Sequence, residues 1–261
     1  MYFYHIFLLP HWGLLINHYG FNKSRPVINF IPPTTIIGAL SYPLNKLLKR
    51  PEQYQEHSGA ELYRRIFRSI NVKLPLFSAY YDLSRVAFMY RGKAEFDAVA
   101  VGKLYKASQE SPIEVIIVVE EGPAEKLLGP KWKDLLRAAC CSINRIGARE
   151  SIITPIEVRE GTPELISDRV VRTKFSFPAY LIKNVSGSYV AGEVVDWRVV
   201  EIGPYVGKKT VGYITPLPTP SSKGEVEVEL AEGYNACKCG EEVIIPWYQL
   251  KSLLSYHLEV Y

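Results

Sequence analysis

The first part of the chain alternates between apolar runs and apolar residues at helical spacing. A nearly continuous apolar run over residues 2–9 predicts a buried central strand, and a β-branched run over 113–119 predicts a second buried strand. Apolar residues three and four positions apart predict helices over 34–49 and 130–143.

Local signals mark the ends of the expected helices. The first helix follows two prolines, and Thr34 and Thr35 are its expected N-caps. Glu61 completes a capping-box pattern that predicts a basic, amphipathic helix over 60–70. Gly147 is the expected C-terminal cap of the last predicted helix.

Residues 80–106 mix aromatic and basic side chains in a less regular pattern. Arg91-Gly92-Lys93 can turn a long β-hairpin there, although a more irregular excursion fits the same residues. From Ser151 onward the pattern predicts strands over 152–158, 175–182, 189–202, 226–230 and 242–245. Strands and helices in the first part, followed mainly by strands, indicate an α+β fold class.

Composition supports a folded protein of ordinary type. The 261 residues are 48% hydrophobic and 22% charged, which excludes disordered, collagen-like and coiled-coil chains. No apolar stretch is long enough to span a membrane, and the N-terminus lacks a basic leader, so we expect a cytoplasmic protein. Cys140-Cys141 and Cys237-Lys238-Cys239 suit reduced thiols. The second group resembles half of a zinc knuckle without its other half, so we expect no metal and no cofactor.

Positive charge is concentrated in the first half of the chain. Residues 1–112 carry 14 Lys and Arg against 7 Asp and Glu, whereas residues 113–261 carry 17 against 20. Aromatic and basic residues are also interleaved in 17–25 and 80–106. Single-stranded RNA is bound by rings that stack on bases beside cations that contact phosphates, so both segments are candidate RNA contacts.

Two motifs together resemble a known family. Residues 22–44 contain Pro32-Pro33-Thr34-Thr35-Ile36-Ile37-Gly38-Ala39-Leu40, and residues 145–151 read Arg-Ile-Gly-Ala-Arg-Glu-Ser. Their order, and their separation by a strand and a helix, resemble the hallmark segments of the Cas-five family of CRISPR-associated proteins, which belongs to the RAMP superfamily. Within that family, the chain looks most like the archaeal type I-A subunit.

The resemblance implies a fold and a role. It implies a ferredoxin-like RNA-recognition domain over 1–155, with a β-hairpin thumb at about 80–110, and a β-rich extension over 156–261. Family members cap the 5′ handle of CRISPR RNA in type I Cascade and dock on the Cas-seven backbone. The expected partners are therefore CRISPR RNA and other Cascade subunits, with target DNA reached through the complex and no membrane.

The candidate site residues fall into two groups. The expected RNA contacts are Tyr19, Phe21, Lys23, Ser24, Arg25, Arg145 and Arg149. The expected thumb and partner contacts are Arg85, Phe88, Tyr90, Arg91, Lys93 and Lys103. Plain structural roles are alternatives, since Arg149 can pair with Glu150 and Gly38 can serve close helix packing.

Catalysis is a separate question. One branch of the family cleaves precursor RNA with a Tyr, Lys and His set that includes an adjacent Lys-His, and this chain has no such pair. We therefore expect a non-catalytic protein. The alternative is a metal-independent endoribonuclease that uses His18, Tyr19 and Lys23. A structural partner that touches no RNA is a third possibility.

Overall fold

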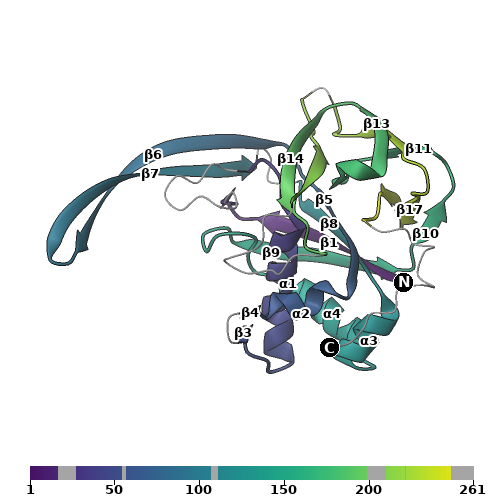
Figure 1. Ribbon diagram of the computed structural model, residues 1–261, viewed down its shortest axis with the longest axis horizontal. Helices are drawn as coiled ribbons and strands as arrows, with labels where there is room; N and C mark the ends of the chain where they lie inside the picture. The colour runs from purple at the N-terminus through teal and green to yellow at the C-terminus, as the bar shows by residue number, and fades with distance from the viewer. Residues whose placement is uncertain (17–27, 55–56, 107–110, 199–209, 221, 248–261) are drawn as a thin grey trace.

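A four-stranded antiparallel sheet lies at the centre of the chain. The computed structural model describes residues 1–16, 28–54, 57–106, 111–198, 210–220 and 222–247 (Figure 1). The central strands, in spatial order, are β5 (Phe67–Lys73), β8 (Ile113–Val119), β1 (Tyr2–Pro10) and β9 (Ile153–Gly161). Ile6 of β1 faces Val115 on one side and Val158 on the other. The predicted buried strands at 2–9 and 113–119 are therefore confirmed.

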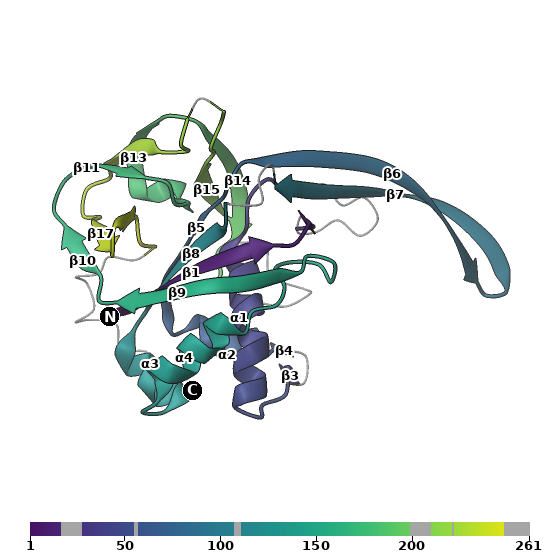
Figure 2. The same ribbon diagram turned by 180° about the vertical axis from the view of Figure 1, so that it is seen from behind.

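Helices cover one face of this sheet (Figures 1 and 2). The described residues contain α1 (Pro33–Leu47), α2 (Ala60–Arg64), α3 (Glu121–Leu128) and α4 (Trp132–Cys141). No described helix is long and apolar enough to cross a bilayer. Along the chain the central elements follow the order strand, helix, strand, strand, helix, strand, formed by β1, α1, β5, β8, α4 and β9.

The ends of the helices differ from the expectations. Pro32 is the N-cap of α1, and no side chain caps it, so Thr34 and Thr35 lie inside the helix. The predicted helix over 60–70 is wrong beyond Arg64, because β5 begins at Phe67 and pairs with β8. Pairing of this buried segment with a central strand outweighs the local helix signal. The helix α3 was not expected at all.

A long β-hairpin projects from the body of the molecule (Figures 1 and 2). Its strands are β6 (Phe77–Tyr90) and β7 (Lys93–Lys106), each with 14 residues. At about 3.3 Å per residue each strand reaches roughly 45 Å. Arg91 and Gly92 form the two-residue turn with positive φ values of 49° and 78°, the conformation that matches strand twist. The hairpin interpretation is confirmed over the irregular alternative.

Small sheets cover the other face of the central sheet (Figure 1). Three of them contain β10 (Glu164–Ile166), β17 (Ala236–Cys239) and β18 (Glu242–Ile244); β11 (Val170–Thr173), β16 (Val226–Leu230) and β13 (Ile182–Ser186); and β12 (Phe177–Pro178), β15 (Thr210–Pro216) and β14 (Tyr189–Val195). The 3-10 turn Ala179–Leu181 precedes β13, and β3 (Gln53–Tyr54) pairs with β4 (His57–Ser58) beside α1. The α+β class is therefore confirmed.

A buried polar joint connects the two layers of β structure. The Asn71 amide of β5 donates to the carbonyls of Ser176 (2.8 Å) and Ile245 (3.0 Å). The Val72 N–H donates to the Ser176 hydroxyl (2.9 Å). Since these groups are buried and paired, the joint fixes how the later β sheets sit on the central sheet.

Candidate nucleic-acid interface

The loop of residues 145–151 lies directly against the stretch that follows β2 (Gly13–Leu14). The Ala148 N–H donates to the Leu15 carbonyl (3.0 Å). Gly147 has a φ of +86°, and a Cβ there would lie 2.6 Å from Leu15 O, so this position requires glycine. Gly147 therefore does not cap α4, which ends well before it. It allows the loop to approach the neighbouring backbone.

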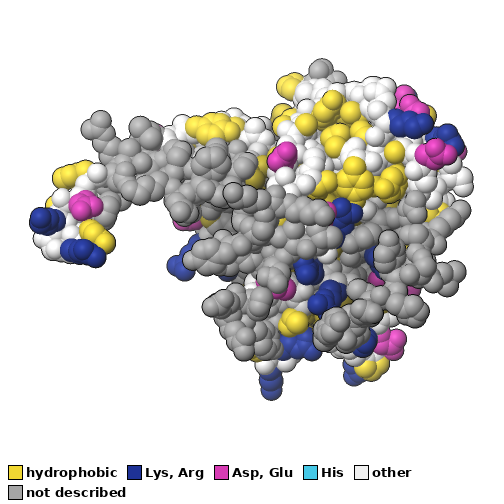
Figure 3. Space-filling view, in the orientation of Figure 1, with side chains coloured by type: hydrophobic (Ala, Val, Ile, Leu, Met, Phe, Trp, Pro, Cys, Tyr) yellow, Lys and Arg dark blue, Asp and Glu magenta, His cyan; other side chains and the backbone are white. Residues whose placement is uncertain are grey.

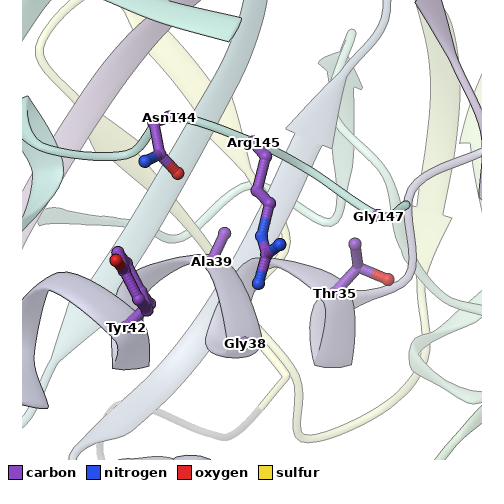
Figure 4. Close-up of a pocket in the computed structure, with 7 residues that line it drawn as sticks. All are labelled: Thr35, Gly38, Ala39, Tyr42, Asn144, Arg145 and Gly147. Carbon is purple, nitrogen blue, oxygen red and sulfur yellow. The ribbon is translucent and has the colours of Figure 1, made fainter. Parts of the chain in front are cut away.

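A hollow of about 330 Å³ lies where this loop faces α1 (Figure 4). It is lined by Thr35, Gly38, Ala39, Tyr42, Asn144, Arg145 and Gly147. The α1 residues follow one another at helical spacing on one face of the helix. The two segments that carry the family resemblance, far apart in sequence, therefore form one site.

Arg145 supplies the positive charge of this hollow. It is exposed, and in Figure 4 its side chain extends across α1. The guanidinium carbon lies 6.0 Å from the centre of the Tyr42 ring, and the Lys46 ammonium lies 5.4 Å from the same ring. Within the described ranges no ion pair involves Arg145, so its charge is available to an anion.

Gly38 leaves open space on the α1 side of the hollow. A Cβ at this position would meet nothing within 4 Å. Close helix packing therefore does not explain this glycine, which corrects that alternative. A mid-helix glycine costs about 0.5–1 kcal/mol relative to alanine. The structure offers one compensating use, which is open space between α1 and Arg145.

The remaining predicted RNA contacts have different outcomes. Tyr19, Phe21, Lys23, Ser24 and Arg25 lie outside the described residues, as does His18. Arg149 is exposed in the 145–151 loop. Neither Glu150 nor any other carboxylate in the described part of the chain forms an ion pair with it.

The predicted thumb residues lie along the whole hairpin. Tyr90, Arg91 and Lys93 are exposed at its tip, where the Arg91 guanidinium stacks on the Tyr90 ring at 5.3 Å. Figure 3 shows basic side chains gathered at this end. Lys103 lies instead at the root, next to the body of the molecule. The backbones of Arg85 and Phe88 belong to β6, and their side chains fall outside the description.

Several pocket residues were missed by the sequence interpretation. Thr35 was assigned to an N-cap, and Tyr42 and Asn144 received no role. A signal was present, because Thr35, Gly38 and Tyr42 are spaced by three and four residues on one predicted helix. Which helix face meets the 145–151 loop depends on tertiary packing, and helical spacing alone does not show it.

The cysteines lie apart from this interface. Cys237 and Cys239 are buried on the same face of β17 among apolar side chains. A hydrogen bond with Cys237, together with burial, raises the pKa of the Cys239 thiol. Burial likewise raises the pKa of Cys140. Neutral thiols in these surroundings behave as small apolar core residues.

His5 is part of a polar cluster on the central sheet. Its Nε2 lies 2.8 Å from Glu114 Oε2, and the Lys73 ammonium donates to Glu114 Oε1 (2.6 Å). Burial works to raise the pKa of Glu114, but the hydrogen bonds from His5 and Lys73 outweigh it, and the pKa is lowered. The cluster therefore holds a charged carboxylate between the sheet and the small sheets above it.

Two known proteins are similar to this chain over most of its length. A protein of Saccharolobus solfataricus named CRISPR system aCascade subunit Cas5 1 is 29% identical over 243 residues, which cover 88% of this chain and 94% of the relative. A second protein of the same organism, CRISPR-associated protein Cas5 3, is 27% identical over the same shares. The chain is therefore similar to two Cas5 proteins over most of its length. The resemblance to the Cas-five motifs is thereby confirmed.

The solved structures agree on the fold. A crystal structure of a CRISPR protein from Archaeoglobus fulgidus superposes with a TM-score of 0.66 and 21% identity, and the match covers 95% of this chain and all of the other. No family model matches the sequence. The similarity to Cas5 proteins therefore rests on the two curated relatives, and the crystal structure adds a shared α+β architecture.

Proposed function

We propose that the chain is a non-catalytic, RNA-binding subunit of a type I-A Cascade. In this role it holds the 5′ handle of the CRISPR RNA and docks on the Cas-seven backbone. The observation that carries the proposal is the joining of both family motifs in one hollow, with Arg145 over Gly38 and Tyr42. The name of a curated relative, an aCascade subunit, supports the same assembly.

The chemistry of the hollow fits an unpaired ribonucleotide. Open space over Gly38 can accept a flat base, and the half-buried Tyr42 ring can stack on it. Arg145 can contact the adjoining phosphate or base. The backbone of the 145–151 loop is held against Leu15, so these groups are ordered before RNA arrives.

The topology supports the same family role. The strand and helix order, with β9 beside β1 and β8 between β1 and β5, supports the ferredoxin-like domain that we propose. The hairpin is inserted between the second and third strands of this domain, and we assign it as the thumb. Its exposed apolar residues suit a protein partner, since Met89 is 70% and Phe96 is 81% exposed.

RNA binding tests the proposal directly. We expect a labelled single-stranded CRISPR repeat RNA to bind the purified chain with an affinity that falls as salt rises. Arg145→Gln should weaken binding and reduce the slope of log affinity against log salt by about 1. Arg172→Gln is the matched control, because Arg172 is an exposed arginine in β11 that already pairs with Glu227.

Three outcomes would contradict parts of the proposal. Absence of salt-sensitive binding would favour a structural partner that touches no RNA. Equal loss in both arginine variants would mean that the hollow has no special role. Cleavage of the RNA that disappears in His18→Ala would show an endoribonuclease.

Partner docking needs its own measurement. Replacing Met89 and Phe96 together by serine should abolish co-purification with the backbone subunit while RNA affinity stays unchanged. Retained co-purification would exclude the hairpin tip as the docking site.

A further inference from the structure

Trp12 is unusual among the tryptophans of this chain. It is 53% exposed, whereas Trp132, Trp197 and Trp247 are each at most 4% exposed. It precedes β2, which pairs with β7 at the root of the hairpin. The fold therefore leaves one of the four indole rings exposed, and hydrophobic burial does not explain its position.

The exposed ring is nevertheless held in a fixed orientation. Its indole N–H donates to the Glu150 carbonyl (3.0 Å), which belongs to the 145–151 loop. The Lys103 ammonium lies 4.4 Å from the centre of the ring. A ring that is oriented in advance loses little freedom when a ligand stacks on it.

The neighbours of Trp12 extend the same chemistry. Lys103 and Tyr80 face each other across the hairpin, and Tyr105 lies on the same side two residues further along β7. The Tyr80 and Tyr105 rings meet edge to face at 6.2 Å. A Cβ on Gly13 would lie 3.1 Å from the Tyr105 ring, so this glycine lets the hairpin root approach closely.

Three of these side chains are flat rings, and the fourth is a cation that lies among them. We call Trp12, Tyr80, Lys103 and Tyr105 the root platform. The Asp82 carboxylate raises the pKa of Tyr80, so its phenol stays neutral. A row of neutral rings with a lysine between them is the arrangement that binds unpaired bases and their phosphates without sequence preference.

We propose that the root platform is a second nucleotide subsite, at which one unpaired base of the bound RNA stacks on Trp12 and Lys103 contacts the adjoining phosphate. This inference rests on the proposed function, because it requires that the chain binds single-stranded RNA. The hydrogen bond to Glu150 ties the platform to the same loop that carries Arg145. The two subsites therefore flank one loop.

Tryptophan fluorescence provides a selective assay. Since the other three tryptophans are buried, quenching during titration with a ten-nucleotide oligoadenylate reports on Trp12. We expect quenching in the intact protein, and its loss in Trp12→Phe. Trp12→Ala should weaken binding by roughly 5- to 150-fold, and Trp12→Phe should recover most of that loss because a ring is retained.

Salt dependence separates stacking from charge. Trp12→Ala should lower affinity without changing the salt slope, whereas Lys103→Met should reduce the slope by about 1. Tyr189→Ala is the matched control, since Tyr189 is an exposed ring in β14, and it should bind like the intact protein.

The outcomes distinguish this inference from the proposed function. Salt-sensitive binding that depends on Arg145, without quenching of Trp12, would overturn the second subsite and leave the first intact. Absence of any RNA binding would overturn both. Normal RNA binding by Trp12→Ala, with failed assembly on a protein partner, would reassign the platform to protein docking.

Discussion

Substitutions of Gly38 should affect stability and RNA affinity in opposite directions. This glycine lies inside α1, and an added Cβ would meet nothing within 4 Å. Alanine restricts the unfolded chain and favours the helix, with no clash to offset the gain. We therefore expect Gly38→Ala to raise the free energy of unfolding by about 0.5–1 kcal/mol, measured by urea denaturation.

RNA affinity should change in the opposite direction. The hollow holds about 330 Å³, and Gly38 forms its floor opposite Arg145 (Figure 4). A stacked base contributes about 1–3 kcal/mol, so a side chain that fills the base position should weaken binding by roughly 5- to 150-fold. Gly38→Leu should approach this limit, and Gly38→Ala should show a smaller loss in fluorescence anisotropy titrations.

Gly122 provides a matched control. It lies in α3, and a Cβ there also meets nothing within 4 Å. Because Gly122 directly precedes Pro123, where a Cβ disfavours the helical conformation, Gly122→Ala controls for RNA affinity alone, which should stay unchanged. The reasoning would be refuted if Gly38→Ala destabilised the protein, or if Gly38→Leu bound RNA as tightly as the original chain.

Three further predictions concern the scaffold, each measured by urea denaturation. Glu114→Gln should cost about 2–3 kcal/mol near pH 7. Because the folded pKa of Glu114 is lowered from 4.5, this difference is full above pH 4.5 and should vanish as pH falls through the folded pKa. Glu225→Gln, at an exposed glutamate, should show no change, and a constant difference for Glu114→Gln down to acid pH would contradict the argument. Gly147→Ala should cost about 1–3 kcal/mol, because φ is positive at this residue and the added Cβ would clash with Leu15 O. Unchanged stability would contradict this close approach. Asn71→Ala should cost about 2–3 kcal/mol by leaving two buried carbonyls without a donor, and a loss below about 0.5 kcal/mol would mean that the joint is not structural.

Strongly patterned elements could be predicted from the sequence because local and tertiary preferences agree there. The runs at 2–9 and 113–119 became central strands, and Val226–Leu230 became β16. The segment 60–70 failed because its local helix signal conflicted with a buried strand that pairs far away in the sequence. A local sequence pattern does not show which distant segment a strand will pair with.

The site was predicted in part for the same reason. Arg145 is expected from a family motif, and it lines the hollow, while its contact with RNA stays a prediction. Trp12 was missed, since its exposure and its contact with Lys103 depend on where the hairpin root packs. An apolar residue next to a predicted strand is normally assigned to the core.

The exceptions to local rules converge on one region. Gly38 weakens a helix without a packing reason, Gly147 adopts a left-handed conformation against Leu15, and Trp12 exposes an indole. Gly147 and Arg145 belong to the 145–151 loop, Gly38 lies in the hollow beneath it, and Trp12 is hydrogen-bonded to its Glu150 carbonyl. Features that reduce stability or solubility persist together where a ligand uses them. Their shared position therefore supports this loop as the centre of the proposed RNA interface.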